Sequence, residues 1–425
     1  MNTKRFPIIA GIAIVAIAIA AFLVLRRAPE AEGSLVGGPV IAGLADKLND
    51  VSTVRFVKAG ETTLLTLQRE GKGWAVVERD GYPADDAKVR LALINLGETK
   101  VLEPKTANPE RYAQLGVQDV DAADATGTRV ELSGEGIDSK LVVGHPVAQG
   151  GEGTYVRRVG EAASLLATGN LVPDPEIGQW LKREITDIPS SRIREIELRQ
   201  GEARPLRVFK NAPEDANFIV ADIPRGREVQ SEVVANGLGS MLAGLTLEDV
   251  AKADVAPSSD LVQHDAVYRL FDGTVITMQG WQETDGADGN PGKAYATFTA
   301  SLDEDQARTA IVADVEREQA TAAAEASAPV DSGAVPGEAA VDVDASASTD
   351  ERQATSGAAV NDAEANPTTP EAKVDVEAET DKRLADLREE VDAMNARLGG
   401  WRFELPAYKF ANVDKSLEDM LKPAN

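Results

Sequence analysis

The same order of strand and helix signals occurs twice along this chain of 425 residues. In the first copy, short runs of alternating apolar and polar residues surround one helical segment, and alternation of this kind is typical of strands with one buried face. The strands expected in this copy cover residues 52–58, 63–68, 73–78, 129–132, 139–143, 154–159 and 164–167. A chain that repeats such a unit is constrained to fold as two similar modules.

The first copy contains one well-marked helix after its third strand. Pro83 lies near the helix start, and Asp85 or Asp86 is placed over the first turn, where a carboxylate stabilises unpaired N–H groups. The apolar side of this helix consists of Val89, Leu93, Ile94 and Leu96, and Gly97 ends it. A second helix is expected at the end of this copy, over residues 176–185.

The second copy follows the same order but is interrupted. Its strands are expected at residues 193–198, 206–209, 217–221, 266–271, 274–279 and 294–300. A helix is expected where Val233, Val234, Leu238, Met241, Leu242 and Leu245 recur at helical spacing. The final strand, 401–405, and a helix over 414–421 return only after a long acidic tract. The tract is therefore interpreted as a loop insertion and not as a linker to a new domain.

The insertion has the composition of a disordered segment. Residues 301–380 contain 19 acidic and 4 basic residues and no aromatic residue. Such a segment cannot bury enough apolar surface to offset the entropy lost on ordering. Residues 303–380 are therefore expected to be disordered, with transient helix around 307–326, and an insertion of this length costs little closure entropy.

An amphipathic helix is expected over residues 381–399. Leu387, Val391, Met394 and Leu398 recur at spacings of four, three and four, and Gly399 follows. This pattern fits a short coiled coil with a partner, and it fits equally a helix packed on its own domain, because fewer than three heptads are present.

Residues 6–25 form an uncharged apolar run, flanked by Lys4 and Arg5 on one side and by Arg26 and Arg27 on the other. Twenty helical residues span about 30 Å, the thickness of a bilayer core. The run is interpreted as an uncleaved membrane anchor, with a cleaved signal peptide as the alternative. We expect the lipid bilayer as a partner, a cytoplasmic N-terminus, and an inner-membrane location with the bulk of the chain in the periplasm. The chain has no cysteine, which suits an oxidising compartment.

The formal net charge of −26 excludes nucleic acid as a natural partner, because phosphate binding requires clustered Lys and Arg. Neither of the two histidines, His145 and His264, lies near a second His in the sequence, which argues against zinc. Asp285, Asp288 and Asn290 lack the alternation and the closing Glu of an EF-hand, and are interpreted as part of a wide turn.

Three carboxylates, Asp119, Asp121 and Asp124, follow a Leu115-Gly116 turn, where polar residues are expected anyway. Hydrolase chemistry would require two acids to converge in a cleft. The tryptophans, which are expected in the core and not as sugar platforms, are Trp74, Trp180, Trp281 and Trp401. The sequence thus predicts no catalytic, cofactor or metal site, and no enzyme.

Four local patterns have a family resemblance: Trp74-Ala-Val-Val, the run from Gly81 to Val89, the run from Leu102 to Val117, and Tyr155-Val-Arg-Arg. They resemble a bacterial domain-of-unknown-function family of membrane-anchored proteins encoded beside ABC transporters of the gliding-motility auxiliary type. The resemblance implies a non-catalytic accessory or scaffold component of the envelope, with transporter subunits as protein partners. A binding module for a glycan or peptide ligand, located in a cleft between the copies, is the alternative, followed by an envelope hydrolase.

The expected fold class is α+β: a single N-terminal transmembrane helix followed by two tandem, similar α+β modules with mainly antiparallel sheets. The expected segments are an anchor (1–27), a linker (28–49), copy one (50–187), the first part of copy two (188–302), the acidic insertion (303–380), the amphipathic helix (381–399), and the last strand and helix of copy two (400–425).

Overall fold

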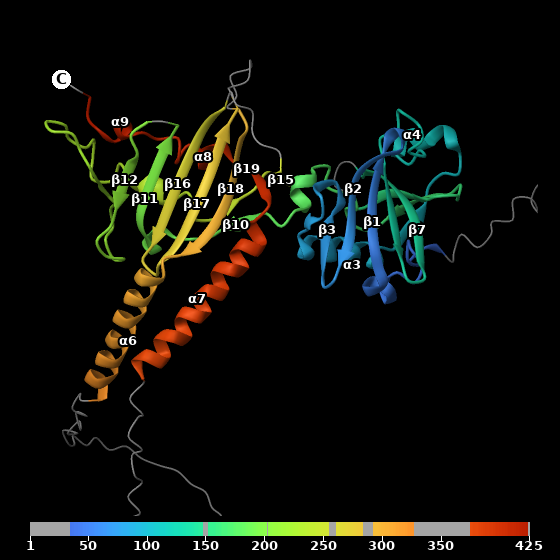
Figure 1. Cartoon of the computed structure of the whole chain (residues 1–425). Coiled ribbons are helices and arrows are strands. Elements are labelled where there is room, and N and C mark those ends of the chain that lie inside the picture. The colour runs from blue at the N-terminus through green and yellow to red at the C-terminus, as the bar shows by residue number, and fades with distance from the viewer. Residues whose placement is uncertain are drawn as a thin grey trace, which may run out of the picture. The chain divides into compact units, whose positions relative to one another are not determined.

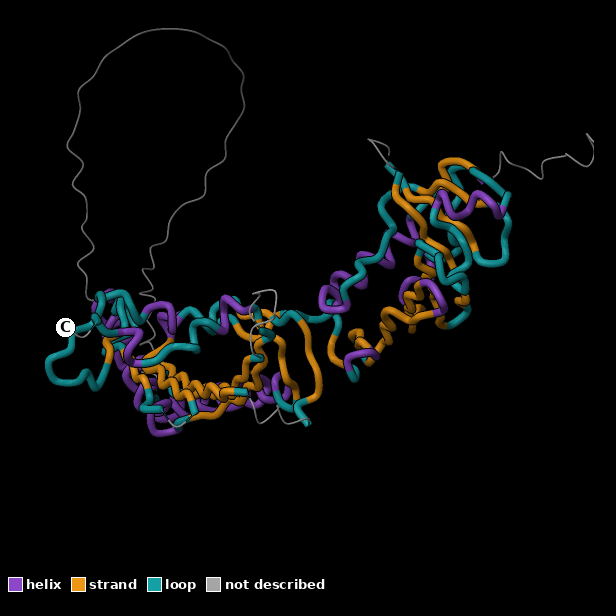
Figure 2. Tube along the Cα trace, turned by 90° about the horizontal axis from the view of Figure 1, so that it is seen from above, coloured by secondary structure: helices purple, strands orange, loops and turns teal. Residues whose placement is uncertain are grey.

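The computed structural model describes residues 35–147, 152–201, 203–254, 261–283, 292–326 and 375–423. The chain divides into two compact units. One comprises Met1–Tyr268, Thr277–Thr299 and Leu398–Asn425, and the other comprises Arg269–Ile276 and Ala300–Arg397. Strands predominate over helices in the first unit, as Figure 2 shows by colour.

The first module is a nine-stranded sheet in the order β4-β3-β2-β1-β6-β7-β8-β9-β5, and each neighbouring pair is antiparallel (Figure 1). Its strands are β1 (Val51–Lys58), β2 (Thr62–Glu70), β3 (Gly73–Val76), β4 (Tyr82–Pro83), β5 (Val101–Pro104), β6 (Thr128–Gly134), β7 (Ile137–Pro146), β8 (Thr154–Arg158) and β9 (Ser164–Ala167). A short strand, β10 (Glu184–Thr186), pairs instead with β14 (Leu245–Thr246).

One face of this sheet is apolar because the side chains of a strand alternate between its two faces. Val54 of β1 lies opposite Leu67 of β2 and Leu132 of β6. Two residues along, Phe56 lies opposite Leu65 and Val130 in the same way. All six side chains are at most 3 % exposed, whereas the alternate positions carry charged groups such as Arg55 and Glu131, which form an ion pair.

Helix α3 (Asp86–Glu98) lies along part of the apolar face of the first sheet, with a cavity between them. The carboxylate of Asp85 caps it, accepting hydrogen bonds from the N–H groups of Ala87 and Lys88 at 3.0 Å. Val89, Leu93 and Leu96 are buried on its inner side. Gly97 lets the helix end pack closely on the short helix η1 (Ala45–Asp50), because a Cβ there would lie a tight 3.3 Å from Ala45 Cα.

The second module is an eight-stranded sheet in the order β13-β12-β11-β16-β17-β18-β19-β15. Its strands are β11 (Ile193–Gln200), β12 (Leu206–Phe209), β13 (Ile219–Val220), β15 (Asp249–Lys252), β16 (Val262–Leu270), β17 (Thr274–Gln282), β18 (Ala294–Leu302) and β19 (Trp401–Leu405). This order repeats that of the first sheet without β4. β19, beyond the insertion, pairs with β18 and β15 as β9 pairs with β8 and β5.

The expected fold class is wrong in its helices. The structure is sheet-rich with few helices, and none of those in its described residues is long and apolar enough to cross a membrane. The apolar run 6–25, and with it the expected anchor over 1–27, lies outside the described residues.

Three expected helices shrink to short turns. The segment 233–245 contains only α5 (Asn236–Gly239), because Gly237, Gly239 and Gly244 weaken helix propagation. The segment 176–185 forms a 3₁₀ turn, η5 (Ile177–Trp180), and then β10, because its backbone pairs with that of residues 83–85. The segment 414–421 contains only α9 (Leu417–Met420), whose N-terminus is stabilised by a capping box between Ser416 and Asp419.

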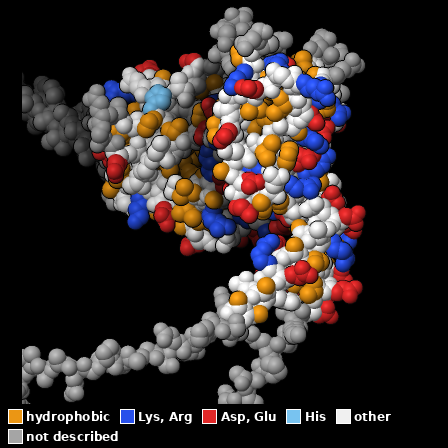
Figure 3. Space-filling model, turned by 90° about the vertical axis from the view of Figure 1, so that its left-hand side faces the viewer, with side chains coloured by type: hydrophobic (Ala, Val, Ile, Leu, Met, Phe, Trp, Pro, Cys, Tyr) orange, Lys and Arg blue, Asp and Glu red, His pale blue; other side chains and the backbone are white. Residues whose placement is uncertain are grey.

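The second unit contains two helices, α6 (Glu304–Ala326) and α7 (Val376–Leu398), which lie side by side (Figure 1). Ala307, Ile311 and Val315 of α6 pack against Leu384 of α7. Ion pairs join Arg308 to Asp381, Arg383 to Glu318 and Arg388 to Glu304 at 2.8–2.9 Å, so the helices run antiparallel. Figure 3 shows side chains of both charges on this pair.

The helical pair corrects the expected disorder over 303–380 at its start. Residues 304–326 are helical because the apolar residues of α6 are buried against α7, and this packing stabilises a helix that would be marginal alone. Helix α7 begins at Val376, five residues before the expected 381, and its apolar side contacts α6 of the same chain. The middle of the insertion, 327–374, lies outside the described residues.

Removal of residues 303–397 tests the division of the chain into two compact units. Joining Leu302 to Leu398 through a short Gly-Ser loop should leave one cooperative unfolding transition, because β18 and β19 are antiparallel neighbours and can be joined by a short turn. Circular dichroism should show retained strand signal and reduced helix signal. A variant that lacks only residues 327–374 is the control and should keep the helix signal. Broad, non-cooperative unfolding of the larger deletion would contradict the division.

Candidate functional site

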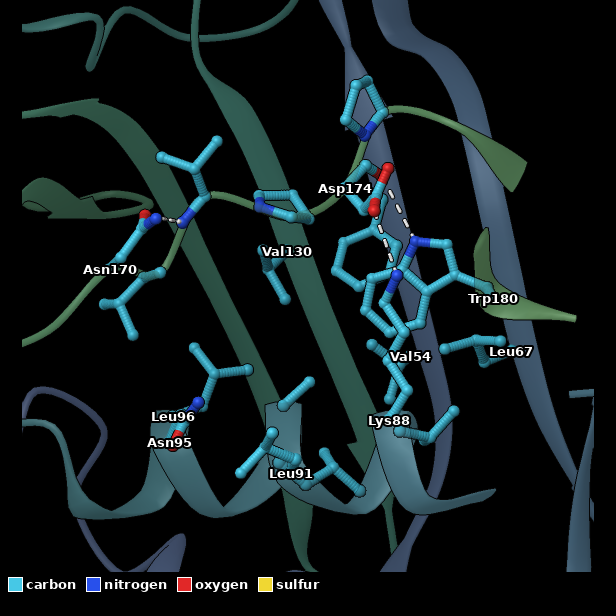
Figure 4. A pocket seen from close by; sticks show the side chains of 18 residues that line it. Val54, Leu67, Lys88, Leu91, Asn95, Leu96, Val130, Asn170, Asp174 and Trp180 are labelled. Atoms are coloured by element: carbon cyan, nitrogen blue, oxygen red, sulfur yellow. Dashed lines mark hydrogen bonds and ion pairs between the residues drawn. The ribbon is translucent and has the colours of Figure 1, made fainter. Parts of the chain in front are cut away.

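A cavity of about 510 Å³ lies in the first module, between α3, the apolar face of the sheet and residues 170–175 (Figure 4). Ligand pockets in proteins are about 300–1,000 Å³. The lining side chains are those of Val54, Phe56, Leu67, Lys88, Val89, Leu91, Ala92, Leu93, Asn95, Leu96, Val130, Asn170, Leu171, Val172, Pro173, Asp174, Pro175 and Trp180. We call this cavity the α3 pocket.

The α3 pocket is elongated along the helix. Its lining positions on α3 run from Lys88 to Leu96, and eight residues of helix rise about 12 Å. In Figure 4, Asn95 and Asn170 lie at one end of the pocket, and Lys88, Asp174 and Trp180 lie at the other. The side chains between the two ends are aliphatic.

Residues 170–175 form the wall opposite α3 and are held by few hydrogen bonds. The N–H of Leu171 donates to Thr154 Oγ1 at 3.1 Å, and that of Val172 donates to Asn170 Oδ1 at 3.1 Å. Pro173 and Pro175 have no N–H to donate. The position of this wall beyond Val172 therefore depends on Asp174.

Asp174 ties this wall to α3 and to Trp180. Its Oδ2 lies 3.0 Å from Lys88 Nζ, and its backbone carbonyl accepts a hydrogen bond from Trp180 Nε1 at 3.2 Å. The Lys88 ammonium also lies 4.9 Å from the centroid of the Trp180 ring. The centroid of the Phe56 ring lies 5.1 Å from that of Trp180. Burial acts to raise the pKa of Asp174, but hydrogen bonds from the Glu176 N–H and Lys88, together with the Lys88 charge, bring that pKa below its ordinary value.

The lining of the α3 pocket is mostly aliphatic. Its two charged residues, Lys88 and Asp174, neutralise each other. The lining contains no Ser, Thr, Cys, His or Tyr, so it lacks the usual nucleophiles and an imidazole base. Sequence reasoning expected the apolar side of α3 and a buried Trp180, but it did not predict the pocket, because residues 170–175 carry no periodic pattern.

The two histidines lie in different sheets. His145 is exposed at the end of β7, with Nε2 3.0 Å from Thr126 Oγ1. His264 is buried in β16, and its ring packs edge-on against Phe410 at 5.2 Å. Burial lowers the pKa of His264, while Asp414 and Asp265 act to raise it. Among the described residues no cluster of three His, Cys, Asp or Glu could hold a metal ion.

The acidic groups noted in the sequence do not converge. Asp119 Oδ1 lies 2.5 Å from Nη2 of the buried Arg157, and this ion pair has a structural role because Arg157 also donates to the Val117 carbonyl. Asp121 and Asp124 are exposed. Asp285, Asp288 and Asn290 lie outside the described residues. Trp74, Trp180 and Trp401 are buried, and Trp281 is half-buried.

Comparison with protein-family models gives a match to part of the chain. Residues 74–264 contain a DUF4340 domain, a domain of unknown function. The matched range begins in β3, includes α3 and most of the α3 pocket lining, and ends in β16. No curated protein and no solved structure matches the chain.

Substitution of Asp174 tests what holds the pocket wall. At pH 7, Asp174→Asn should lower the free energy of unfolding by about 0.2–1 kcal/mol, since both partners are about one-third exposed. Because the folded-state pKa of Asp174 is lowered, its carboxylate stabilises the fold above the unfolded value of about 3.9. The difference between variant and wild type should therefore shrink as the pH falls through the folded-state pKa.

Denaturant titrations at several pH values measure this difference. Asp121→Asn is the matched control, because that side chain is exposed and forms no ion pair among the described residues. An Asp174→Asn variant as stable as the control variant at pH 7 would show that the ion pair does not hold the wall.

Proposed function

We propose that this chain is a non-catalytic binding protein of the cell envelope, with the α3 pocket as its binding site. The observation that carries the proposal is the chemistry of that pocket: an elongated, aliphatic cavity whose only two charged side chains are paired with each other. Cavities that are mostly apolar, with a few polar groups at their ends, are typical ligand sites.

The hydrolase alternative has little support in the described residues. A glycosidase needs two carboxylates that face each other across a cleft. Asp119 is occupied by Arg157, and Asp174 by Lys88. Neither pairs with a second carboxylate, so the described geometry favours binding over hydrolysis.

The glycan alternative is also disfavoured for this pocket. Sugar recognition needs many hydrogen-bond partners and accessible aromatic faces. The α3 pocket offers the two amides Asn95 and Asn170 and one ion pair, and the Trp180 ring is already covered by Lys88 and Phe56. An apolar ligand fits this lining better than a sugar does.

The setting of the protein is proposed from its sequence. The patterns around Trp74, Gly81 and Tyr155 resemble the family encoded beside gliding-motility-type ABC transporters, and we propose that the chain is an accessory component of such a transporter. An inner-membrane location with most of the chain in the periplasm is proposed from the apolar run 6–25 and its flanking charges.

A dye-binding experiment tests the pocket. An uncharged apolar dye such as Nile red should bind the folded protein and gain fluorescence, and Ala92→Phe should abolish the gain because Ala92 is a half-buried lining residue. Ala87→Phe is the matched control, since Ala87 is exposed on the same helix and does not line the pocket. Equal dye binding by both variants, with unchanged melting temperatures, would exclude the α3 pocket as the site.

A co-purification experiment tests the proposed partner. The full chain, tagged at its C-terminus and solubilised from its native membrane in mild detergent, should co-purify subunits of an ABC transporter, identified by mass spectrometry. The tagged protein without its transporter genes is the control. Reproducible purification of the chain without transporter subunits would contradict the accessory role and would leave the dye result unaffected.

A further inference from the structure

We infer that the α3 pocket takes a single alkyl or acyl chain of an amphiphile with an uncharged polar head, its tail towards Trp180 and its head at the asparagine end. This inference rests on the proposed binding function and names the ligand class for the same site. Four features of the pocket carry it.

The first feature is shape. The lining runs for about 12 Å along α3, from Lys88 to Leu96. The side chains of the sheet wall, such as Val54 and Val130, are at most 3 % exposed, so the slot does not continue past them into the sheet. A slot extended along the helix accommodates a linear chain more readily than a compact ring system.

The second feature is the lining. The residues between the two ends of the slot are chiefly Val, Leu and Ala, which offer aliphatic contact and no directional bond. The aromatic rings of Phe56 and Trp180 pack against each other at the Trp180 end of the pocket, so they do not form a free stacking platform. Such a lining recognises a saturated chain through burial alone.

The third feature is the rim. Leu91 on α3 and Val172 on the opposite wall are 58 % and 44 % exposed, although both belong to the pocket lining. A chain bound in the slot would cover both side chains and so add to the apolar area that is buried on binding. Figure 4 shows Leu91 along the helix between the two ends of the pocket.

The fourth feature is the charge at the two ends. The asparagine end carries the side chains of Asn95 and Asn170 and no charged lining residue. The Oδ1 of Asn170 accepts the Val172 N–H, and its amide N–H groups have no partner among the described residues. Lys88 and Asp174 lie at the other end and neutralise each other. The site therefore offers hydrogen bonds to a neutral head and no counter-charge to an ionic one.

The test measures affinity against chain length. Hexyl, octyl and decyl glucosides, each below its micelle concentration, are titrated calorimetrically into the full-length protein. Burial of one CH₂ group contributes about 0.8 kcal/mol, so each added CH₂ should raise the affinity about fourfold. Glucose alone should not bind, and decanoate and decyltrimethylammonium should bind more weakly than decyl glucoside. Affinity independent of chain length, or highest for a charged head, would overturn the inference.

Variants and a quenching probe locate the chain. Ala92→Phe should lower the decyl glucoside affinity at least about tenfold, and Ala87→Phe should change it by less than about twofold. An alkyl glucoside brominated at its chain end should quench the emission of Trp180, and Trp180→Phe should remove that quenching. The quenching measurement decides the matter if Ala92→Phe does not fold, and absence of quenching would place the tail elsewhere.

Two failures are distinguishable. If Nile red binds in an Ala92-sensitive manner while no alkyl glucoside does, the acyl-chain inference is wrong and the pocket remains a binding site for another apolar ligand. If neither binds, both the inference and the proposed binding function are wrong.

Discussion

The packing of α3 against the first sheet is the contact on which the candidate site depends. Val89, Leu93 and Leu96 are buried on one side of the helix, and they line the same cavity as side chains of β1, β2 and β6. The helix does not cover the whole of the apolar face of the sheet, and residues 170–175 close the remaining side through the Lys88–Asp174 ion pair. The pocket is thus the space between α3, the sheet and residues 170–175.

The second module has the same strand order as the first, but a few residues change the segment that corresponds to α3. Its eight strands follow the order of the first sheet, but the segment corresponding to α3 contains three glycines and forms only the four-residue α5. A side chain in place of Gly239 would clash with the Phe218 ring at 2.6 Å. Leu238, Met241 and Leu242 are buried at 2 % exposure or less, so this segment packs closely where the first module is hollow.

Sequence reasoning located features that depend on local pattern. The expected strand 52–58 coincides with β1, and the expected helix after Pro83 coincides with α3, because alternation, capping and a terminal glycine are all local signals. It failed where the local structure depends on contacts between residues far apart in the sequence. Residues 176–185 pair with residues 83–85, and residues 304–326 are helical because α7 packs on them. The α3 pocket was missed for the same reason, since no local signal brings residues 170–175 over α3.

Amide hydrogen exchange of the full-length protein, with and without decyl glucoside, tests whether the α3 pocket binds an alkyl chain. Binding there should slow exchange in α3 and at Leu171, Val172 and Asp174 and leave the N–H groups of the second module unchanged. Slowing confined to other segments, or no slowing at a concentration that saturates the calorimetric titration, would contradict a binding site between α3 and residues 170–175.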